Sequence, residues 1–342
     1  MRDFVGFKKG VNLGGWLSQC DYSLDRLENF IKEDDIARIA GWGADHVRLP
    51  FDFNIVLDEN GDLKPDAFKY LDRAVEWSQK HGLNIILDLH KTMGYSFDPG
   101  EKEVGFFSNV KYQDIFVNLW KAVAARYADK PDRIAYEILN EITDDEFAQP
   151  WNKIARRAVE EIRKIAPKNY IIYGGIHNNS IKGLPLLEKP HDDRIVFTFH
   201  FYDPLIFTHQ KAYWVEGMPA DFEMAYPAPT AEYVEKSNKF PEKKIPEVFE
   251  GYTEDTVDAR FFEFYMKEAV EFAEKMNTPL YCGEYGVIEI APHEDTLRWH
   301  RDMRDTFDKL NIARAIWSYK EMDYGIIDDI RKPIYDELIK LI

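Results

Sequence analysis

The chain has 342 residues, of which 45% are hydrophobic and 31% are charged, a balance typical of globular rather than disordered or fibrous proteins. With 44 Lys and Arg against 61 Asp and Glu, its formal net charge is −17, which disfavours nucleic acids and anionic membranes as partners. No apolar run approaches the ~20 residues of a membrane-spanning helix, and no signal-peptide stretch follows Met1. We therefore expect a cytoplasmic protein, or a secreted one if a leader has been removed.

Apolar segments of strand length recur along the chain, and apolar residues at helical spacing separate them. The first strand runs into a Gly-Gly pair, and the second is stopped by Pro50. Phe68, Leu71 and Val75 then lie at i, i+3 and i+7 and predict a helix, and the same alternation continues. The strands are nearly continuously apolar, which is typical of buried parallel strands; they are predicted at 11–13, 46–50, 84–90, 134–139, 170–173, 195–199, 280–282 and 313–319.

Eight strands separated by helices predict an α/β fold, the closed (β/α)8 TIM barrel, as a single domain over residues 1–342. The competing doubly wound sheet is disfavoured, because no GxGxxG or GxxxxGK[ST] pattern follows any strand. The connection after the sixth strand holds roughly seventy residues, far more than a usual βα connection. Its second half, 258–276, is predicted to be the barrel helix. Residues 203–257 are then an insertion on the C-terminal face, interpreted as a cap or substrate wall, with an insertion of no functional role as the alternative.

Polar residues at the carboxyl ends of barrel strands are candidates for catalysis, because these ends form the active-site face. Two of them are carboxylates, Glu141 after the fourth strand and Glu284 after the seventh. A pair of carboxylates beside an arginine and two histidines suits acid/base cleavage of a glycosidic bond, in which one carboxyl stays protonated and the other ionised. The other candidates are Arg48, His90, Asn140, His200, Tyr202 and Trp317.

Rival chemistries lack their patterns in this chain. A metal hydrolase would require HxH or HExxH, and a serine hydrolase GxSxG; none of these occurs. Cys20 and Cys282 form neither a disulfide framework nor a CxxC pair. We therefore predict no metal and no cofactor.

Several strand-end motifs occur in the order found in a known family. Together they resemble glycoside hydrolase family 5, and within it the clostridial endoglucanases of the cellulase C type, from Gly10 to about Lys332. The resemblance implies a retaining endo-β-1,4-glucanase that cleaves β-glucan, cellulosic or glucomannan chains by double displacement. The motifs are GVNLGGW at 10–16, HVRLP at 46–50, LDLH at 87–90, EILNE at 137–141, HFY at 200–202, GEYG at 283–286 and IWSY at 316–319.

The resemblance also assigns roles to residues. Glu141 would be the general acid/base and Glu284 the nucleophile. Arg48 and Tyr202 would donate hydrogen bonds to Glu284, and Asn140 would hold the 2-hydroxyl of the sugar under attack.

The remaining strand-end residues would shape the catalytic subsite. His200 would partner the acid/base, His90 would line the subsite, and Trp317 would form its hydrophobic floor, since an indole face packs on the C–H face of a pyranose.

Four further residues are candidates for substrate binding. Trp16 is either a sugar platform or a core residue, and Trp214 is either a substrate wall or packed within the insertion. His177 and Asn178 follow the fifth strand, where they either reach sugar hydroxyls or form a turn.

Sugar preference stays open at this point. Lys91 and Met93 stand where many relatives carry a second His and a Pro, in a loop that borders the glycone side of the site. The motifs are shared by β-mannanases and β-1,3-glucanases, which are the alternatives within the family. A catalytically weak sugar-binding barrel or a transglycosylase is the alternative outside hydrolysis. The expected partner is a β-linked polysaccharide or oligosaccharide, and a monomer is the default oligomeric state.

Overall fold

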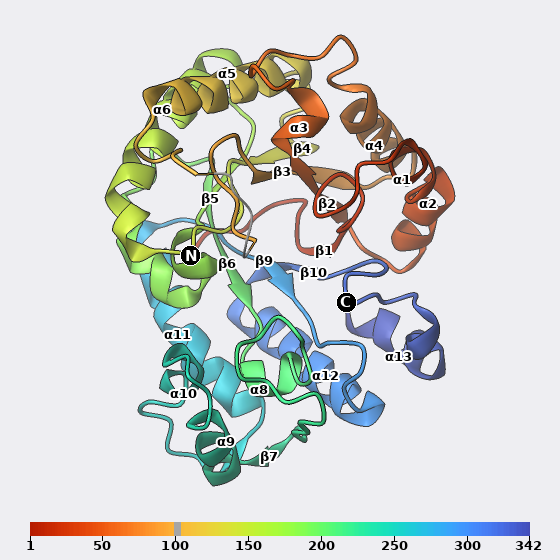
Figure 1. Cartoon of the computed structure of the whole chain (residues 1–342), viewed down its shortest axis with the longest axis vertical. Helices are drawn as coiled ribbons and strands as arrows, with labels where there is room; N and C mark the ends of the chain where they lie inside the picture. Colours follow the sequence, from red (N-terminus) through yellow and green to blue (C-terminus); the bar gives the residue numbers. More distant parts are fainter. Residues whose placement is uncertain (99–103) are drawn as a thin grey trace.

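The computed structural model describes residues 1–98 and 104–342 (Figure 1). In this part of the chain eight parallel strands close into a barrel in the order β1-β10-β9-β6-β5-β4-β3-β2, which confirms the predicted TIM barrel. Gly10 of β1 pairs with His46 of β2, and Lys9 pairs with Arg314 of β10, so the first and last strands complete the ring. The strands are β1 (Lys9–Asn12), β2 (His46–Asp52), β3 (Asn84–Lys91), β4 (Ile134–Glu137), β5 (Ile171–Tyr173), β6 (Ile195–Phe201), β9 (Leu280–Tyr285) and β10 (Ala313–Ile316).

The longer helices surround the barrel and bury their apolar stripes against it (Figure 1). These are α2 (Glu33–Gly41), α4 (Lys69–Lys80), α5 (Val110–Tyr127), α6 (Ala148–Ile165), α11 (Ala259–Met276) and α12 (His293–Leu310). Shorter helical segments occupy the connections: α1 (Leu24–Asn29), α3 (Phe53–Val56), α7 (Ile176–Asn179), α13 (Tyr335–Leu338), and the 3-10 turns η1 (Asp145–Phe147), η2 (Ile181–Leu186), η3 (Asp329–Ile334) and η4 (Ile339–Leu341).

The connection from β5 to β6 departs from the repeating pattern, because it contains only the short segments α7 and η2. Gly175 has φ 101, and His177 and Asn178 also have positive φ, so the backbone cannot continue as a regular right-handed helix. Pro185 interrupts the segment that follows. Strand-helix alternation therefore holds for most of the barrel but not for its fifth unit.

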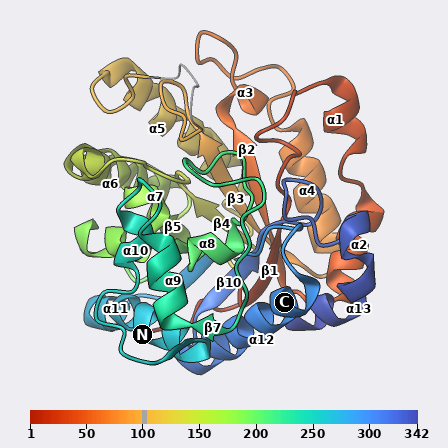
Figure 2. The ribbon, with the colours of Figure 1, turned by 60° about the horizontal axis from the view of Figure 1, so that its bottom comes forward.

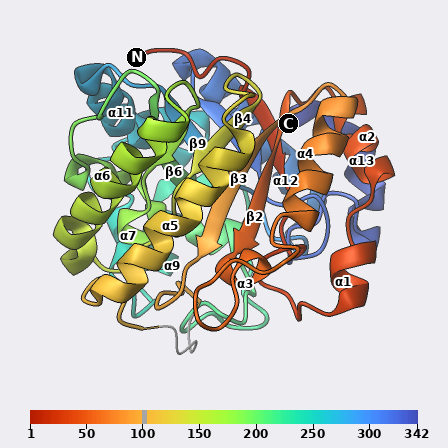
Figure 3. The same cartoon turned by 90° about the horizontal axis from the view of Figure 1, so that it is seen from above.

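The barrel interior has an apolar end and a charged end. At the amino ends of the strands, Phe4 and Phe7 join the apolar cluster formed by Ile86, Ala135, Ile172, Val196, Tyr281, Ala313, Ala315 and Tyr170. In Figure 3, β2 and β3 run away from the end at which the N-terminus lies. At the opposite end, the buried side chains of Arg48, Asp88 and Glu137 point to a polar centre. The fold thus concentrates buried charge at the carboxyl ends of the strands.

Residues 202–258 connect β6 to α11 and include 203–257, the range predicted as an insertion. They contain α8 (Leu205–Thr208), α9 (Thr230–Ser237), α10 (Lys244–Glu247) and the antiparallel pair β7 (Ala228–Pro229) and β8 (Thr256–Val257). Figure 2 shows α8, α9 and α10 grouped on one side of the barrel. Within the described residues, no helix has both the length and the apolar character required to cross a membrane.

Candidate active site

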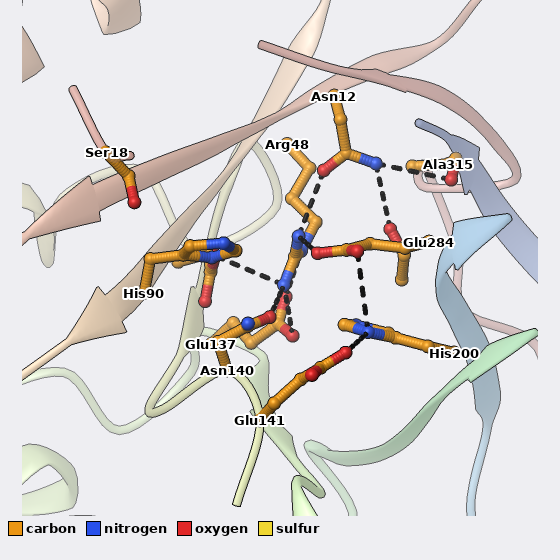
Figure 4. Close-up of polar contacts among 12 residues, drawn as sticks. Asn12, Ser18, Arg48, His90, Glu137, Asn140, Glu141, His200, Glu284 and Ala315 are labelled. Carbon is orange, nitrogen blue, oxygen red and sulfur yellow. Dashed lines mark hydrogen bonds and ion pairs between the residues drawn. The ribbon is translucent and has the colours of Figure 1, made fainter. Parts of the chain in front are cut away.

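The ends of β2, β3, β4, β6 and β9 bring their polar side chains together around one point (Figure 4). A hollow of about 720 Å³ opens above them. Its lining includes both predicted carboxylates, Glu141 and Glu284, and also Trp214 and Lys244 of the insertion. The insertion therefore contributes part of the wall around the strand ends.

Arg48 is the centre of the buried polar network. Its Nε and Nη2 donate to the two carboxylate oxygens of Glu137, at 2.7 and 2.9 Å. Its Nη1 donates to Glu284 Oε1 at 2.8 Å, and Nη2 also reaches Asn140 Oδ1 at 2.8 Å and lies 3.1 Å from Asp88 Oδ2. The guanidinium is fully buried, and these carboxylates hold its pKa well above the ordinary value against the effect of burial.

Glu284 is held in one orientation by two donors. Arg48 binds Oε1, and the Tyr202 hydroxyl donates to Oε2 at 3.0 Å. Asn12, the strand neighbour of Arg48 on β1, accepts from Arg48 at 3.0 Å and donates to the Gly283 carbonyl at 2.9 Å, so it ties the arginine to the strand that carries Glu284. The carboxylate is thus fixed by the Arg48 guanidinium on one oxygen and by the Tyr202 hydroxyl on the other.

Glu141 lies in a different environment. Its Oε1 is 2.7 Å from His200 Nδ1. Only 18% of its side chain stays accessible, through the hollow, and this burial raises the pKa of Glu141 to about 7. A hydrogen bond from Asn178 and the positive charges of Lys244 and Arg48 act in the opposite direction. Burial lowers the pKa of His200 to about 4, so its imidazole is neutral at neutral pH.

The two candidate carboxylates are close neighbours. An oxygen of Glu141, an oxygen of Glu284 and a nitrogen of His200 all lie within 4.8 Å of one another. Retaining glycosidases place their carboxyl groups about 5–5.5 Å apart, whereas inverting enzymes leave about 6.5–9.5 Å for a water molecule. The same three atoms are also near enough to bind a cation, but Arg48 and Tyr202 already donate to both oxygens of Glu284. The arrangement therefore suits acid/base and nucleophilic chemistry.

His90 and Trp317 form a second part of the hollow. The His90 ring stacks on the Trp317 indole with their centroids 5.9 Å apart and their planes 3° apart. Asp88 Oδ2 lies 2.6 Å from His90 Nδ1, which leaves Nε2 as the nitrogen not committed to Asp88. Burial lowers the pKa of His90 to about 3, so the ring is neutral. Together the two parallel rings line the hollow that also holds Glu284.

Lys91, one of the departures from the family pattern, is buried and pairs with Asp98 across a 2.5 Å contact. Gln19 donates to the other oxygen of Asp98 at 3.0 Å, and both Gln19 and Asp98 line the hollow. This part of the hollow is therefore bounded by a paired carboxylate. Met93 is only partly buried and does not line the hollow.

Trp16 requires a correction. It is fully buried, its ring stacks on Trp77 at 6.2 Å, and its Nε1 donates to the Leu27 carbonyl at 3.0 Å. Gly15 has φ 73, so the chain turns just before Trp16 and the indole packs beneath the loop rather than in the hollow. The alternative of core packing is the one that the structure supports.

The other predicted substrate contacts fall in different places. Trp214 lines the hollow, keeps 39% of its surface exposed and packs edge-on against Tyr213. Asn178 lines the hollow as well and contacts Glu141. His177 lies 2.8 Å from Asp145 Oδ1 and borders a smaller neighbouring pocket instead of the hollow.

Sequence reasoning missed Asp88, Glu137 and Asn12, which hold Arg48 and His90. The sequence held a signal for Asp88 and Glu137, because each is a charged residue within an otherwise apolar strand. Asp88 lies two residues before His90, and Glu137 lies four residues before Glu141. Such a charge is rarely buried unless it is paired. It also missed Asp203 and Lys244, for which no local pattern pointed to the site.

Comparisons with known proteins show the family and the fold. The family model described as cellulase, glycosyl hydrolase family 5, matches residues 9–323. Cellodextrinase A of Ruminococcus flavefaciens is 44% identical over 90% of this chain and 84% of its own length. Endoglucanase C of Acetivibrio thermocellus is 38% identical over 99% of this chain and 98% of its own.

Solved structures share the fold. A mutant form of Thermotoga maritima Cel5A in complex with cellobiose has a TM-score of 0.77 at 23% identity, covering 98% of this chain and 96% of that one. The cellulose synthase subunit Z of Clostridioides difficile has a TM-score of 0.75 at 23% identity, covering 98% and 99%.

Proposed function

Because the chain belongs to glycosyl hydrolase family 5 and is an O-glycosyl hydrolase, we propose that it cleaves β-1,4-linked glucan chains internally, with Glu141 as acid/base and Glu284 as nucleophile. The observation that carries this proposal is the pair itself. The two carboxylates have oxygens within 4.8 Å of each other, and one has a pKa raised to about 7 while the other is bound by Arg48 and Tyr202. This spacing supports double displacement with retention.

In the first step, a Glu284 oxygen attacks the anomeric carbon and the bond from that carbon to the leaving oxygen breaks. The proton on Glu141 passes to the leaving oxygen, which makes the departing sugar neutral. In the second step, Glu141 takes a proton from water, the water oxygen bonds to the anomeric carbon, and Glu284 leaves as a carboxylate. His200, neutral and 2.7 Å from Glu141, holds that carboxyl in place through both steps.

Asn140 supports the transition state in this proposal. Its Oδ1 is taken by Arg48, while its buried Nδ2 has no hydrogen-bond partner among the described residues. A buried donor of this kind is stabilised when a ligand oxygen accepts from it. The sugar 2-hydroxyl next to the anomeric carbon is the oxygen suited to this position.

The surrounding residues hold the chain. Trp317 provides an aromatic face for the sugar under attack with His90 stacked beside it, and Trp214 provides an apolar wall on the insertion. We assign residues 203–257 to this wall, since Trp214 and Lys244 line the same hollow as the two glutamates. The named relatives, a cellodextrinase and an endoglucanase, favour a β-1,4-glucan over a mannan or a β-1,3-glucan.

A panel of polysaccharides tests the substrate. Barley β-glucan and cello-oligosaccharides should release reducing sugar fastest, with glucomannan second and laminarin slowest. Viscosity of barley β-glucan should fall faster than reducing ends appear, as expected for internal cleavage. Proton NMR should show the β-anomer as the first product; an α-anomer would mean inversion and would overturn the mechanism.

Two variants test the roles of the glutamates. Glu284→Ala should lose activity on every substrate, because each requires the nucleophile. Glu141→Ala should keep glycosylation by an aryl glycoside whose leaving group needs no proton, and a glycosyl-enzyme should accumulate. Mass spectrometry of a fluorosugar adduct locates the nucleophile. An adduct on Glu141 would show that the roles are reversed.

A further inference from the structure

A smaller pocket of about 170 Å³ lies beside the main hollow. The pocket begins where the acid/base is, because the two share Glu141, Asn178, Tyr202, Leu205, His209 and Lys244 in their walls. Its far side is built by the insertion helix α10 and by α11. The pocket is much smaller than the hollow. Its size suits one saccharide unit rather than a stretch of chain.

The lining residues show which half of a substrate this pocket faces. It borders Glu141 and His200 but not Glu284, His90 or Trp317, which surround the sugar under attack. Glu141 protonates the leaving oxygen, so the leaving half of the substrate lies on its side. The pocket is therefore on the leaving-group side of the cleaved bond.

Asp203 gives this pocket its chemistry. It follows directly after Tyr202 beyond the end of β6 and lines the pocket. Among residues 1–98 and 104–342, no group donates a hydrogen bond to its carboxyl and no cation pairs with it. Burial raises the pKa of Asp203 to about 7, with Lys244 acting in the opposite direction. The Lys244 ammonium is instead 2.8 Å from Glu242.

An unpaired carboxyl group in a protein cavity is stabilised by a ligand that supplies O–H donors. The other walls are mixed. Leu205, Ile245, Val248 and Tyr265 are apolar or aromatic, while Ser180, Lys182 and Glu247 are polar or charged. Polar groups set among apolar and aromatic walls match a pyranose, which has hydroxyls on its edge and C–H groups on its faces. A carboxylate accepts two hydroxyls at once through its two oxygens.

We propose that this pocket binds the first sugar on the leaving side of the cleaved bond, and that Asp203 is the residue that selects it by accepting its hydroxyl hydrogen bonds. The inference rests on the proposed function and adds a specificity residue to it. If the inference is correct, substrates with a sugar at this position are cleaved more efficiently than substrates with a leaving group that has no hydroxyls.

Two substrates separate this role from catalysis itself. Cellopentaose places a glucosyl unit in the pocket, whereas 4-nitrophenyl β-cellobioside places a phenol there, which has no hydroxyls for Asp203. In Asp203→Asn, the ratio of kcat/KM for cellopentaose to kcat/KM for the aryl cellobioside should fall about tenfold or more, mainly through KM. Asp255→Asn, the same change at an exposed position of the insertion, should leave this ratio unchanged.

Lys244 provides a second variant, because it lies in the wall of the same pocket on the insertion. Lys244→Gln should also lower the ratio. If one sugar contacts both side chains, the double variant should lose less than the product of the two single losses.

Three results would overturn the proposal. One is an unchanged ratio in Asp203→Asn, and another is an equal loss on both substrates, which would place the effect in folding or in Glu141. Wild-type protein inactive on both substrates would overturn the proposed function and this inference with it. Wild-type activity on both, with no effect of Asp203→Asn, would overturn the inference alone.

Discussion

Arg48 contacts carboxylates from Asp88, Glu137 and Glu284, and its side chain is fully buried. Burial raises the pKa of Asp88 to about 7 and raises that of Glu137, while the guanidinium lowers both. Glu137 takes two of the guanidinium donors in a paired contact, which leaves Nη1 directed at Glu284. Glu137 is therefore a positioning residue that acts on the nucleophile through Arg48.

The variant Glu137→Gln tests this role. Its amide nitrogen cannot accept from Arg48, so one arginine donor is left buried and unpaired, and attack by Glu284 should slow by about 10- to 100-fold. The rate of inactivation by a 2-fluoro-cellobioside measures that attack alone. Glu188→Gln, at an exposed ion pair with Arg156, serves as the control. An unchanged inactivation rate would contradict the positioning role even if the melting temperature fell.

The pKa of Glu141 sets a pH dependence. As the acid of the first step, Glu141 must be protonated, so kcat/KM should decline as pH rises through about 7. An aryl glycoside with a good leaving group should show a weaker decline, because its departure needs no proton. Measurement of kcat/KM from pH 5 to 9 on both substrates checks this. Identical profiles would assign the alkaline limb to another group.

The same raised pKa affects stability with a definite sign. In the window between its unfolded pKa, about 4.3, and its folded pKa, about 7, Glu141 binds more protons when folded. Its contribution to the free energy of unfolding therefore falls as pH rises through this window. Glu141→Gln should raise the melting temperature more at pH 8 than at pH 5, which thermal unfolding at the two pH values would show.

At the scale of elements, two tryptophans in loops of the barrel differ in what they support. Trp16 packs on Trp77 of α4 and joins the loop after β1 to that helix, whereas Trp214 projects from the insertion into the hollow. Trp16→Ala should lower the free energy of unfolding by about 3–5 kcal/mol. Trp214→Ala should change it by less than about 1 kcal/mol and raise KM instead. Urea unfolding and KM on barley β-glucan measure the two effects; a KM change in Trp16→Ala without loss of stability would contradict this division.

The elements that sequence could predict are those with strong periodicity. Strands such as β3 and β6 are long apolar runs bounded by polar residues, and α6 and α11 have clear helical spacing. The barrel could therefore be predicted from this alternation of strands and helices. The last strand, predicted at 313–319, ends earlier, at Ile316, because its hydrogen bonds to the neighbouring strands become irregular there. The β5–β6 connection was only partly predictable: a turn at His177 and Asn178 was one of two interpretations, but the replacement of a regular barrel helix by α7 and η2 had no signal of its own.

The candidate site divides in the same way. Side chains at the ends of regular strands, such as Glu141 and Glu284, were predictable because strand ends converge in any barrel. Lys244 was not, because α10 is four residues long and carries no periodic signal. Asp203 lies in the loop between β6 and α8, and only the folded insertion shows which pocket it lines. Their relation to Glu141 depends on how the insertion folds over the barrel. Only the three-dimensional structure contains that information.

At the scale of the whole molecule, the formal charge of −17 should affect which polymers approach the hollow. An anionic substrate such as carboxymethyl-cellulose is repelled, and salt screens this repulsion because the Debye length shortens from about 30 Å at 0.01 M to about 10 Å at 0.1 M. Between these salt concentrations, kcat/KM for carboxymethyl-cellulose should rise several-fold while that for neutral barley β-glucan stays constant. Equal responses of the two polymers would contradict a long-range charge effect.

The pairing of β1 with β10 has a consequence for biosynthesis. Lys9 meets Arg314 across about 300 residues of chain. At ribosomal rates of about 5–20 residues per second, β1 waits about 15–60 s for this neighbour to emerge. During that interval the edge of β1 that will meet β10 is open and able to pair with other nascent chains. Chaperone capacity should therefore limit the yield of this protein during rapid expression, and slower translation at low temperature should increase the fraction that reaches the closed barrel.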